Sequence, residues 1–347
     1  MMGGGSVGYD IVMVFLSIIL FTLSIILLII LICRKKSVES EDNLPVKIYG
    51  RAYPFVEVDT ATDGFNQRRI IGSGRLGIVY AATIRTSSVT GEEHHTIAVK
   101  RIHSRLVLNN AGFGFSSIVK SLSVACHPNV VPIVGFSEAP GERIILMEFI
   151  PMKSLDFHLQ QNANDASFLD WTRRIKIAAG TARGIEYLHE SMSPSIIHGC
   201  VKPSNILIDM NLTAKVCDYG LSFLAPQEMR NLIGYVDKEC LVEKKGASKE
   251  NDVYGFGVVL LELLSGRSAE DGLLVDWAIP LIRDLRIIEV LDPRISVPYS
   301  DLKPVTRLAK LASACVSNTR KNRPSIVQVV TILNNLEMQL SLDLNIQ

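Results

Sequence analysis

The pattern of hydrophobic and polar positions divides the chain into three parts. Residues 11–33 form one uncharged hydrophobic run that is interrupted only by Ser17, Thr22 and Ser24. A charged segment follows, and beyond it the hydrophobic residues recur with the short periods of a folded domain. From about residue 70 to residue 148 the pattern is mainly that of strands, and after that helices dominate. This order predicts an α+β domain with a small sheet-rich half and a larger helical half.

Individual elements can be placed within this domain. Phe55, Val58, Ala61 and Phe65 recur at helical spacing, which predicts a short amphipathic helix that packs on the domain. Strands are predicted around residues 78–80, 96–99 and 144–147, with one helix at 115–125 between them. Longer helices are predicted at 171–190, 252–264 and 302–316.

The hydrophobic run at 11–33 predicts a transmembrane helix. At 1.5 Å per residue it is about 34 Å long, enough to cross a hydrocarbon core of about 30 Å with some tilt. A signal peptide would need a basic leader and a shorter run, and the first ten residues contain no Lys or Arg. A buried core helix of this length would show some polar stripe. The basic residues 34–36 after the run predict that the remainder of the chain is cytosolic.

Composition narrows the possible partners. The formal net charge is +1, so no global field would steer the protein toward nucleic acid, and we expect no nucleic-acid partner. The six cysteines are scattered, without the spacing of a zinc site. They are interpreted as reduced thiols in a cytosolic domain.

A glycine-rich motif opens the sheet-rich half. Gly72, Gly74 and Gly77 stand at the spacing that lets a backbone hairpin approach phosphate groups closely. The motif alone is weak, because dinucleotide-binding folds use it too. Here a second strand follows rather than a helix, and Ala98-Val99-Lys100 then supplies a strand lysine suited to phosphate oxygens.

Two polar motifs lie in the helical half. The first is Ile197-His198-Gly199-Cys200-Val201-Lys202-Pro203-Ser204-Asn205, and the second is Asp218-Tyr219-Gly220. Asn205 and Asp218 supply hard oxygen ligands of the kind that magnesium takes alongside nucleotide phosphates.

Together these motifs resemble the protein kinases, and in particular the plant receptor-like Ser/Thr kinases. Further sequence motifs support the resemblance, at residues 61–65, 169–174, 234–239, 252–257, 258–267 and 323–324. The resemblance implies a two-lobed kinase-like fold at 64–338, preceded by one transmembrane helix. It also implies a site for ATP and magnesium, with Asn205 and Asp218 as metal ligands. The implied nucleotide-binding residues are Gly72, Ser73, Gly74, Gly77, Val79, Ala98, Lys100, Glu148, Asn205 and Asp218.

The chain departs from the kinase pattern at the residues that carry the reaction. Cys200 stands where the family has the Asp that accepts the substrate proton, although Lys202 is retained. A thiol with an ordinary pKa of about 8.5 is mostly neutral at pH 7. Ile118 stands where the family has the helix Glu that pairs with the strand lysine, and residues 103–126 contain no acid. Lys100 is therefore expected to lie unpaired, to contact Asp218, or to await phosphate.

Two more departures concern the activation segment, residues 218–239. Gly199 replaces the Arg that grips a loop phosphate, and Ser222 is the only Ser or Thr in the segment. The pair Asp237-Lys238 replaces Ala-Pro. In contrast, the architectural residues are retained. We expect Glu239 and Arg323 to form a buried ion pair, and Asp252 to support the backbone of the catalytic loop.

The sequence thus predicts a single-pass, membrane-anchored pseudokinase, placed at the plasma membrane, which binds ATP and acts as a scaffold or allosteric partner. Its expected partners are the lipid bilayer and other membrane kinases or cytosolic signalling proteins. One alternative is a weakly active Ser/Thr kinase that transfers the ATP γ-phosphate to protein hydroxyls. Another is an interaction module that binds no nucleotide. The predicted division is a stub at 1–10, the span at 11–33, a juxtamembrane segment at 34–63, the kinase-like domain at 64–338 and a tail at 339–347.

Overall fold

The structure is a computed structural model, and the backbone contacts divide it into two compact units, Met1–Ile48 and Tyr49–Gln347. It describes residues 13, 20–25, 50–88, 91–109, 114–161, 169–224, 234–237, 247–295 and 302–344. In the first unit, the described residues Met13 and 20–25 are helical. No helix among the described residues is long and apolar enough to cross a membrane. Most of the predicted span at 11–33 lies outside those residues.

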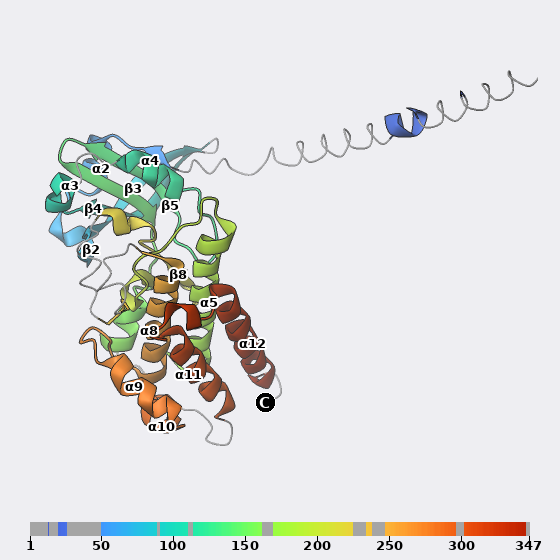
Figure 1. The fold of residues 1–347 in the computed structure, drawn as a ribbon. Coiled ribbons are helices and arrows are strands. Elements are labelled where there is room, and N and C mark those ends of the chain that lie inside the picture. Colours follow the sequence, from blue (N-terminus) through green and yellow to red (C-terminus); the bar gives the residue numbers. More distant parts are fainter. Residues whose placement is uncertain are drawn as a thin grey trace, which may run out of the picture. The chain divides into compact units, whose positions relative to one another are not determined.

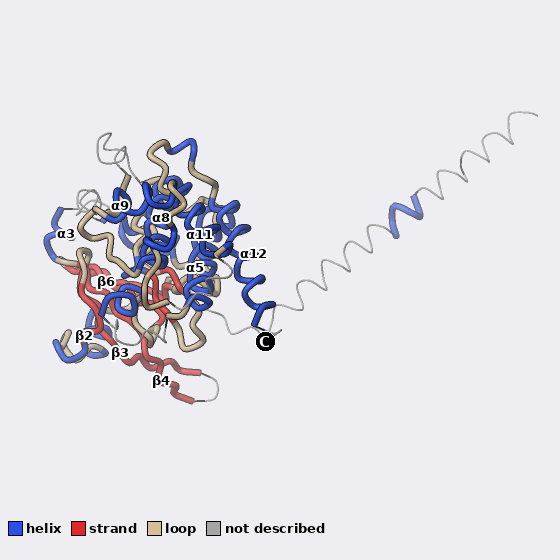
Figure 2. Tube along the Cα trace, turned by 90° about the horizontal axis from the view of Figure 1, so that it is seen from below, coloured by secondary structure: helices blue, strands red, loops and turns tan. Residues whose placement is uncertain are grey.

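The second unit has two lobes, a smaller one built on a sheet and a larger one built of helices (Figures 1 and 2). The sheet has the strand order β1-β5-β6-β4-β3-β2, in which β1 and β5 are parallel and the other neighbours antiparallel. Its strands are β1 (Arg51–Ala52), β2 (Ile70–Ser73), β3 (Gly77–Ser88), β4 (Gly91–Ile102), β5 (Ile133–Ala139) and β6 (Glu142–Glu148). The predicted strands at 78–80, 96–99 and 144–147 lie within β3, β4 and β6.

Strand alternation on β4 decides which way its lysine points. Ile97 and Val99 are buried in one hydrophobic cluster, and Ala98 and Ile102 belong to the other. Because successive side chains of a strand point to opposite faces, Lys100 shares the face of Ala98 and Ile102. That face is the one turned toward the main core of the protein.

The opposite face of the sheet is covered by α2 (Phe55–Ala61). Val58 of this helix is buried. After the helix, the ring of Phe65 meets the ring of Tyr80 edge to face at 5.4 Å between centroids. The predicted amphipathic helix and its packing against the domain are confirmed, but the helix ends at Ala61, so Phe65 lies beyond it with φ +53°.

Two short helices connect β4 to β5: α3 (Ser104–Asn109) and α4 (Phe115–Leu122). The predicted helix at 115–125 is thus found three residues shorter. The backbone N–H of Ser123 donates to the carbonyl of Val119, and the hydroxyl of Ser123 donates to the carbonyl of Lys120. These bonds close the last turn of α4 before the chain leaves toward β5.

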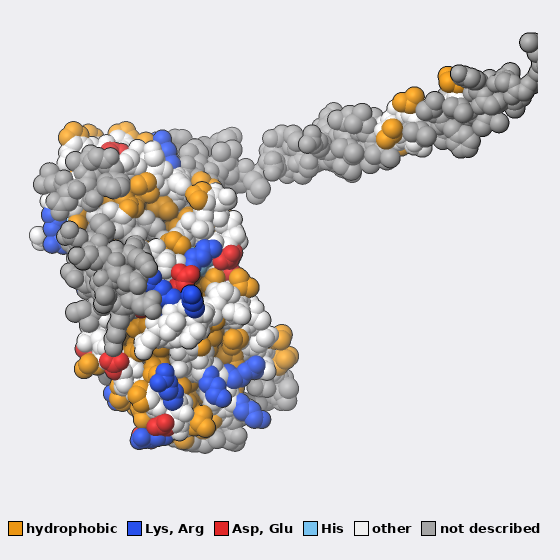
Figure 3. Space-filling model, viewed as in Figure 1, with side chains coloured by type: hydrophobic (Ala, Val, Ile, Leu, Met, Phe, Trp, Pro, Cys, Tyr) orange, Lys and Arg blue, Asp and Glu red, His pale blue; other side chains and the backbone are white. Residues whose placement is uncertain are grey.

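The helical lobe is organised around α8 (Lys249–Ser265). Every residue from Asp252 to Ser265 is buried, which is the expected position for a helix that is hydrophobic on all sides. Around it lie α5 (Trp171–Glu186), α9 (Leu274–Arg283), α10 (Ile287–Val290), α11 (Lys303–Cys315) and α12 (Ile326–Leu344). Lysine and arginine side chains on the face shown in Figure 3 are dispersed over this lobe rather than gathered into one patch.

A small hairpin of β7 (Ile206–Ile208) and β8 (Ala214–Val216) joins the lobes. The backbone of Val216 donates to the carbonyl of Asn129 and accepts from the N–H of Val131, both at 2.9 Å. The side-chain amide of Asn129 also donates to the carbonyl of Ala214 at 2.8 Å. These bonds hold the end of β8, and the Asp218 that follows it, below the sheet face that carries Lys100.

Candidate functional site

The loop at 198–205 is supported by one buried carboxylate. Asp252, which is 1% exposed, accepts hydrogen bonds from the backbone N–H groups of His198 and Gly199, each at 2.7 Å. It also pairs with Nε2 of His189 at 2.8 Å. The predicted role of Asp252 as a support for this loop is confirmed by these contacts.

Gly199 has a conformation and a neighbour that exclude a larger residue. Its φ is +79°, in the left-handed region that favours glycine. A Cβ built there would lie 2.8 Å from Cβ of Ser222, which is too close for two carbon atoms. The arginine that the family places at this position would therefore require both the loop and Ser222 to move.

Cys200 cannot serve as a general base. Burial raises the pKa of its thiol to about 11, so the group is neutral at physiological pH. Lys202, Asp218 and Lys100 are near enough to act on this thiol electrostatically, which places the predicted reaction residues in one neighbourhood. This agrees with the interpretation of Cys200 as a poor substitute for the family's base, which stays a prediction.

Asn205 is oriented by the same loop. It follows Pro203 in the short 3-10 helix η4 (Pro203–Asn205), and its side-chain amide donates to the carbonyl of Cys200 at 2.9 Å. This bond uses the amide nitrogen and leaves the amide oxygen as an acceptor. The Asn205 oxygen and the Asp218 carboxylate fit the hard-oxygen preference of magnesium, so these two residues would hold the ion.

Lys100 and Asp218 form a salt bridge. The lysine is only 6% exposed, and the carboxylate reaches it because the chain turns sharply after β8. Asp218 has φ +62° and Gly220 has φ +70°, both in the left-handed region. Of the three outcomes left open by the sequence, the structure shows contact with Asp218.

The helix that carries a glutamate in the family has an apolar inner face here. Phe115, Val119 and Leu122 of α4 are buried, and Ile118 is partly buried against the same core. No carboxylate is available on this helix to pair with Lys100. The helix also contacts the turn after Asp218, since a Cβ on Gly220 would lie 2.5 Å from Cδ2 of Leu122.

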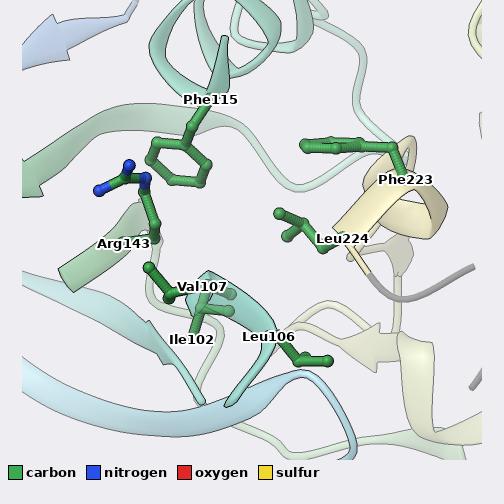
Figure 4. A pocket seen from close by; sticks show the side chains of 7 residues that line it. All are labelled: Ile102, Leu106, Val107, Phe115, Arg143, Phe223 and Leu224. Carbon is green, nitrogen blue, oxygen red and sulfur yellow. The ribbon is translucent and has the colours of Figure 1, made fainter. Parts of the chain in front are cut away.

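The turn after Asp218 continues into a short 3-10 helix, η5 (Leu221–Leu224). Phe223 and Leu224 line a small apolar pocket together with residues of β4, α3, α4 and β6 (Figure 4). The other lining residues are Ile102, Leu106, Val107, Phe115 and Arg143. This part of the activation segment therefore packs under α4 through apolar contacts.

Among the described residues, the acid that pairs with Arg323 differs from the one that the sequence predicted. Glu239, the predicted partner, lies outside them. Asp237, which is 2% exposed, accepts from Nη1 of Arg323 at 2.6 Å and pairs with Nη2 of Arg320 at 3.2 Å. The sequence pattern identified Asp237 only as a replacement for the family's alanine and did not predict that it would pair with Arg323. A carboxylate two residues before the expected acid was the available signal.

The glycine-rich motif forms the turn between β2 and β3. The N–H of Gly74 donates to the carbonyl of Gly77 at 3.0 Å. A Cβ on Gly77 would lie 2.1 Å from the carbonyl oxygen of Arg101, so this glycine is required by strand pairing whether or not a phosphate binds. Val79 pairs with Lys100, and Glu148 pairs with Ile97 at the edge of the hinge between the lobes. Binding of nucleotide by these residues stays a prediction.

The fold and these motifs agree with the comparison to known families. The family model for protein tyrosine and serine/threonine kinases matches residues 65–333. The chain therefore belongs to the protein kinase family. Its relatives include receptor-like kinases and related Ser/Thr kinases of Arabidopsis thaliana.

Three relatives illustrate the range of similarity. The chain is 33% identical to the proline-rich receptor-like protein kinase PERK2 of Arabidopsis thaliana, over 84% of this chain and 41% of PERK2. It is 34% identical to the probable serine/threonine-protein kinase PBL7 of the same plant, over 87% of this chain and 81% of PBL7. Among solved structures it resembles the pseudokinase domain of BIR2, an immune regulator of the RLK/Pelle family. That likeness has a TM-score of 0.66 and 30% identity, and covers 82% of this chain and 86% of the BIR2 chain. The chain spans less than two thirds of the length of the receptor-like relatives PERK2 and PERK3.

Proposed function

We propose that this protein is a membrane-anchored pseudokinase of the receptor-like kinase type, which binds ATP and acts in phospho-signalling as a scaffold or allosteric partner. The observation that carries the proposal is the state of the reaction residues. Cys200 is a neutral thiol at the position of the base, and Lys100 pairs with Asp218 instead of a helix carboxylate. The likeness to the BIR2 pseudokinase domain supports it.

Loss of the base alone would slow phosphoryl transfer by roughly 10²–10⁴-fold without abolishing it. The second loss acts on a different step. A kinase in its active state places the strand lysine on the nucleotide through an ion pair with the helix glutamate, and Ile118 cannot form that pair. Because the two losses affect proton removal and substrate positioning separately, their effects multiply.

Transfer of radiolabelled phosphate tests the proposal. Full-length protein in detergent, with ATP and magnesium, is expected to label itself and a generic acceptor protein no more than the Asp218→Asn variant does. Labelling by the wild-type protein that the Asp218→Asn substitution abolishes would contradict the pseudokinase assignment. It would establish the weakly active Ser/Thr kinase instead, an alternative supported by the retention of Lys202, Asn205 and Asp218.

Nucleotide binding is supported by the orientation of Asn205 and by the burial of Lys100 beside Asp218. Calorimetric titration of the full-length protein with ATP tests it, with a Lys100→Ala, Asp218→Asn double variant as the control. Saturable heat in the wild-type protein that is absent from the control is expected. Equal heats in both proteins would favour an interaction module without nucleotide, in which the salt bridge serves only the fold.

Membrane anchoring is supported by the uncharged run at 11–33 and by the basic residues 34–36 after it. The anchor would bring the kinase-like domain close to membrane kinases, which are the proposed partners together with cytosolic signalling proteins. Extraction of cell membranes with alkaline carbonate is expected to leave the protein in the pellet. Release into the supernatant, as for a peripheral protein, would contradict the anchor.

A further inference from the structure

The cleft between the lobes has a different charge from that of the family pattern. Four charged residues of the kinase motifs lie within the described part of the chain: Lys100, Lys202, Asp218 and Asp252. Asp252 is common to both patterns and is engaged by the loop backbone. The other three sum to +1. The family's acids at positions 118 and 200 would bring that sum to −1, and here these positions hold isoleucine and cysteine.

The salt bridge places a cation of the protein on the carboxylate that would hold magnesium. The Lys100 ammonium contacts Oδ2 of Asp218. An ammonium has three N–H donors, so one can stay on Asp218 while the others bind phosphate oxygens. No carboxylate on α4 competes for this ammonium, because Ile118 and its neighbours on the inner face are apolar.

We propose that this cleft binds nucleoside polyphosphates such as ATP without requiring a divalent cation. This inference rests on the nucleotide binding proposed above. In the family pattern magnesium offsets the repulsion between an acidic cleft and the phosphates. Here two of the carboxylates are missing, and Lys100 and Lys202 supply positive charge directly. Magnesium therefore adds less to the affinity for ATP in this cleft, and it competes with Lys100 for Asp218.

The test is a pair of calorimetric titrations of the full-length protein with ATP, one in excess magnesium and one in EDTA. We expect the dissociation constant in EDTA to be within about threefold of that in magnesium, or smaller. A dissociation constant more than about threefold larger in EDTA would overturn this inference while leaving nucleotide binding intact. Absence of binding in both conditions would overturn nucleotide binding itself, and this inference with it.

Variants that restore the family's charge sharpen the test. The acidic double variant Ile118→Glu, Cys200→Asp is compared with the neutral variant Ile118→Gln, Cys200→Asn, which matches it in size and polarity. We expect ATP binding by the acidic variant to weaken in EDTA by roughly tenfold or more relative to magnesium, because each added carboxylate repels the phosphates. The neutral variant should keep the wild-type ratio. Equal behaviour of the two variants would overturn the electrostatic explanation.

Ile118 packs against the core, so the acidic double variant requires a check of folding by circular dichroism and thermal unfolding. If it does not fold, the single variants Cys200→Asp and Cys200→Asn carry the same comparison at a position that is not part of the core clusters. Their ratios of affinity in EDTA and magnesium are expected to differ by roughly threefold or more. Identical ratios would count against the proposal.

Discussion

Two groups of residues in this protein differ in how many of their charged groups they retain. The first, here called the brace, comprises Asp252 and Glu262 of α8 together with Asp237 and Arg323. The second, here called the cleft, comprises Lys100, Ile118, Cys200 and Asp218. In the brace every residue has a hydrogen-bond or ion-pair partner, and Asp237 supplies an acid for Arg323. In the cleft two carboxylates of the family are replaced by uncharged groups.

This difference shows that the two groups serve separate purposes within one fold. The brace holds the loop at 198–205 and the segment around Tyr235 against α8, and this is needed for folding whether or not phosphate is transferred. The charged cleft residues Lys100 and Asp218 are proposed to act in nucleotide binding instead. The following predictions test that separation, beginning with the largest expected effect.

Replacing Asp252 by alanine should destabilise the protein most. The substitution removes the acceptor of two backbone N–H groups and of His189 in a fully buried place. Leaving these donors unsatisfied should lower the free energy of unfolding by about 3–5 kcal/mol. Urea denaturation followed by fluorescence measures it. A loss no greater than that caused by an exposed helix substitution such as Lys310→Ala would contradict the structural role of Asp252.

Glu262 should make stability depend on pH. Burial raises the pKa of this carboxyl to about 8 from an ordinary value of 4.5, while Tyr235 and the N–H of Ala269 donate to its Oε1. The folded protein keeps the proton that the unfolded chain releases, so this contribution is complete below pH 4.5 and is lost as the pH rises through about 8. The free energy of unfolding should fall by roughly 1 kcal/mol per pH unit between these values.

Glu262→Gln is the matched variant for this pH dependence, since glutamine resembles the protonated acid and does not titrate. We expect the two proteins to have similar stability near pH 5. Near pH 8 the variant should be more stable by about 2–4 kcal/mol. Urea denaturation at a series of pH values measures the difference. Parallel curves for the two proteins would exclude Glu262 as the source.

Gly199→Ala should have an intermediate effect. The φ of +79° is unfavourable for a residue with a Cβ, and the new methyl group would meet Ser222. A loss of about 1–2 kcal/mol in the free energy of unfolding is expected. The double variant Gly199→Ala, Ser222→Gly should recover part of it, since the steric contact is removed while the backbone strain remains. No recovery would indicate that strain alone accounts for the loss.

The salt bridge of the cleft should matter least for stability. Removing one partner, as in Lys100→Met, leaves the partly buried Asp218 without its cation, which should cost less than the roughly 3–5 kcal/mol typical of a fully buried pair. The double variant Lys100→Met, Asp218→Asn should lie within about 1 kcal/mol of the wild type, because a buried pair can be replaced by neutral groups at little cost. Thermal unfolding of these two variants, of Asp218→Asn alone and of the wild type measures the coupling. A double variant as unstable as Asp252→Ala would place the cleft in the same class as the brace.

Much of the fold could be predicted from the sequence because its signals are local. The amphipathic spacing of Phe55 and Val58 predicted α2 and its packing, and the hydrophobic pattern at 252–264 predicted the helix that lies within α8. The end of α4 was placed three residues too late, because the sequence after Leu122 stays compatible with a helix. The salt bridge of Lys100 was one of three open alternatives, since its two residues are 118 positions apart.

The sequence by itself determined the family and the chemical losses in this protein. Residue identity alone establishes that a thiol replaces the base at 200 and that residues 103–126 contain no acid. Only the tertiary structure decided where the remaining charges went. It placed Lys100 on Asp218, Asp237 on Arg323, and Ser222 against Gly199. The physical reason is that a buried charge pairs with whichever opposite charge the folded backbone brings within reach, and that distance is set by packing between segments far apart in the chain.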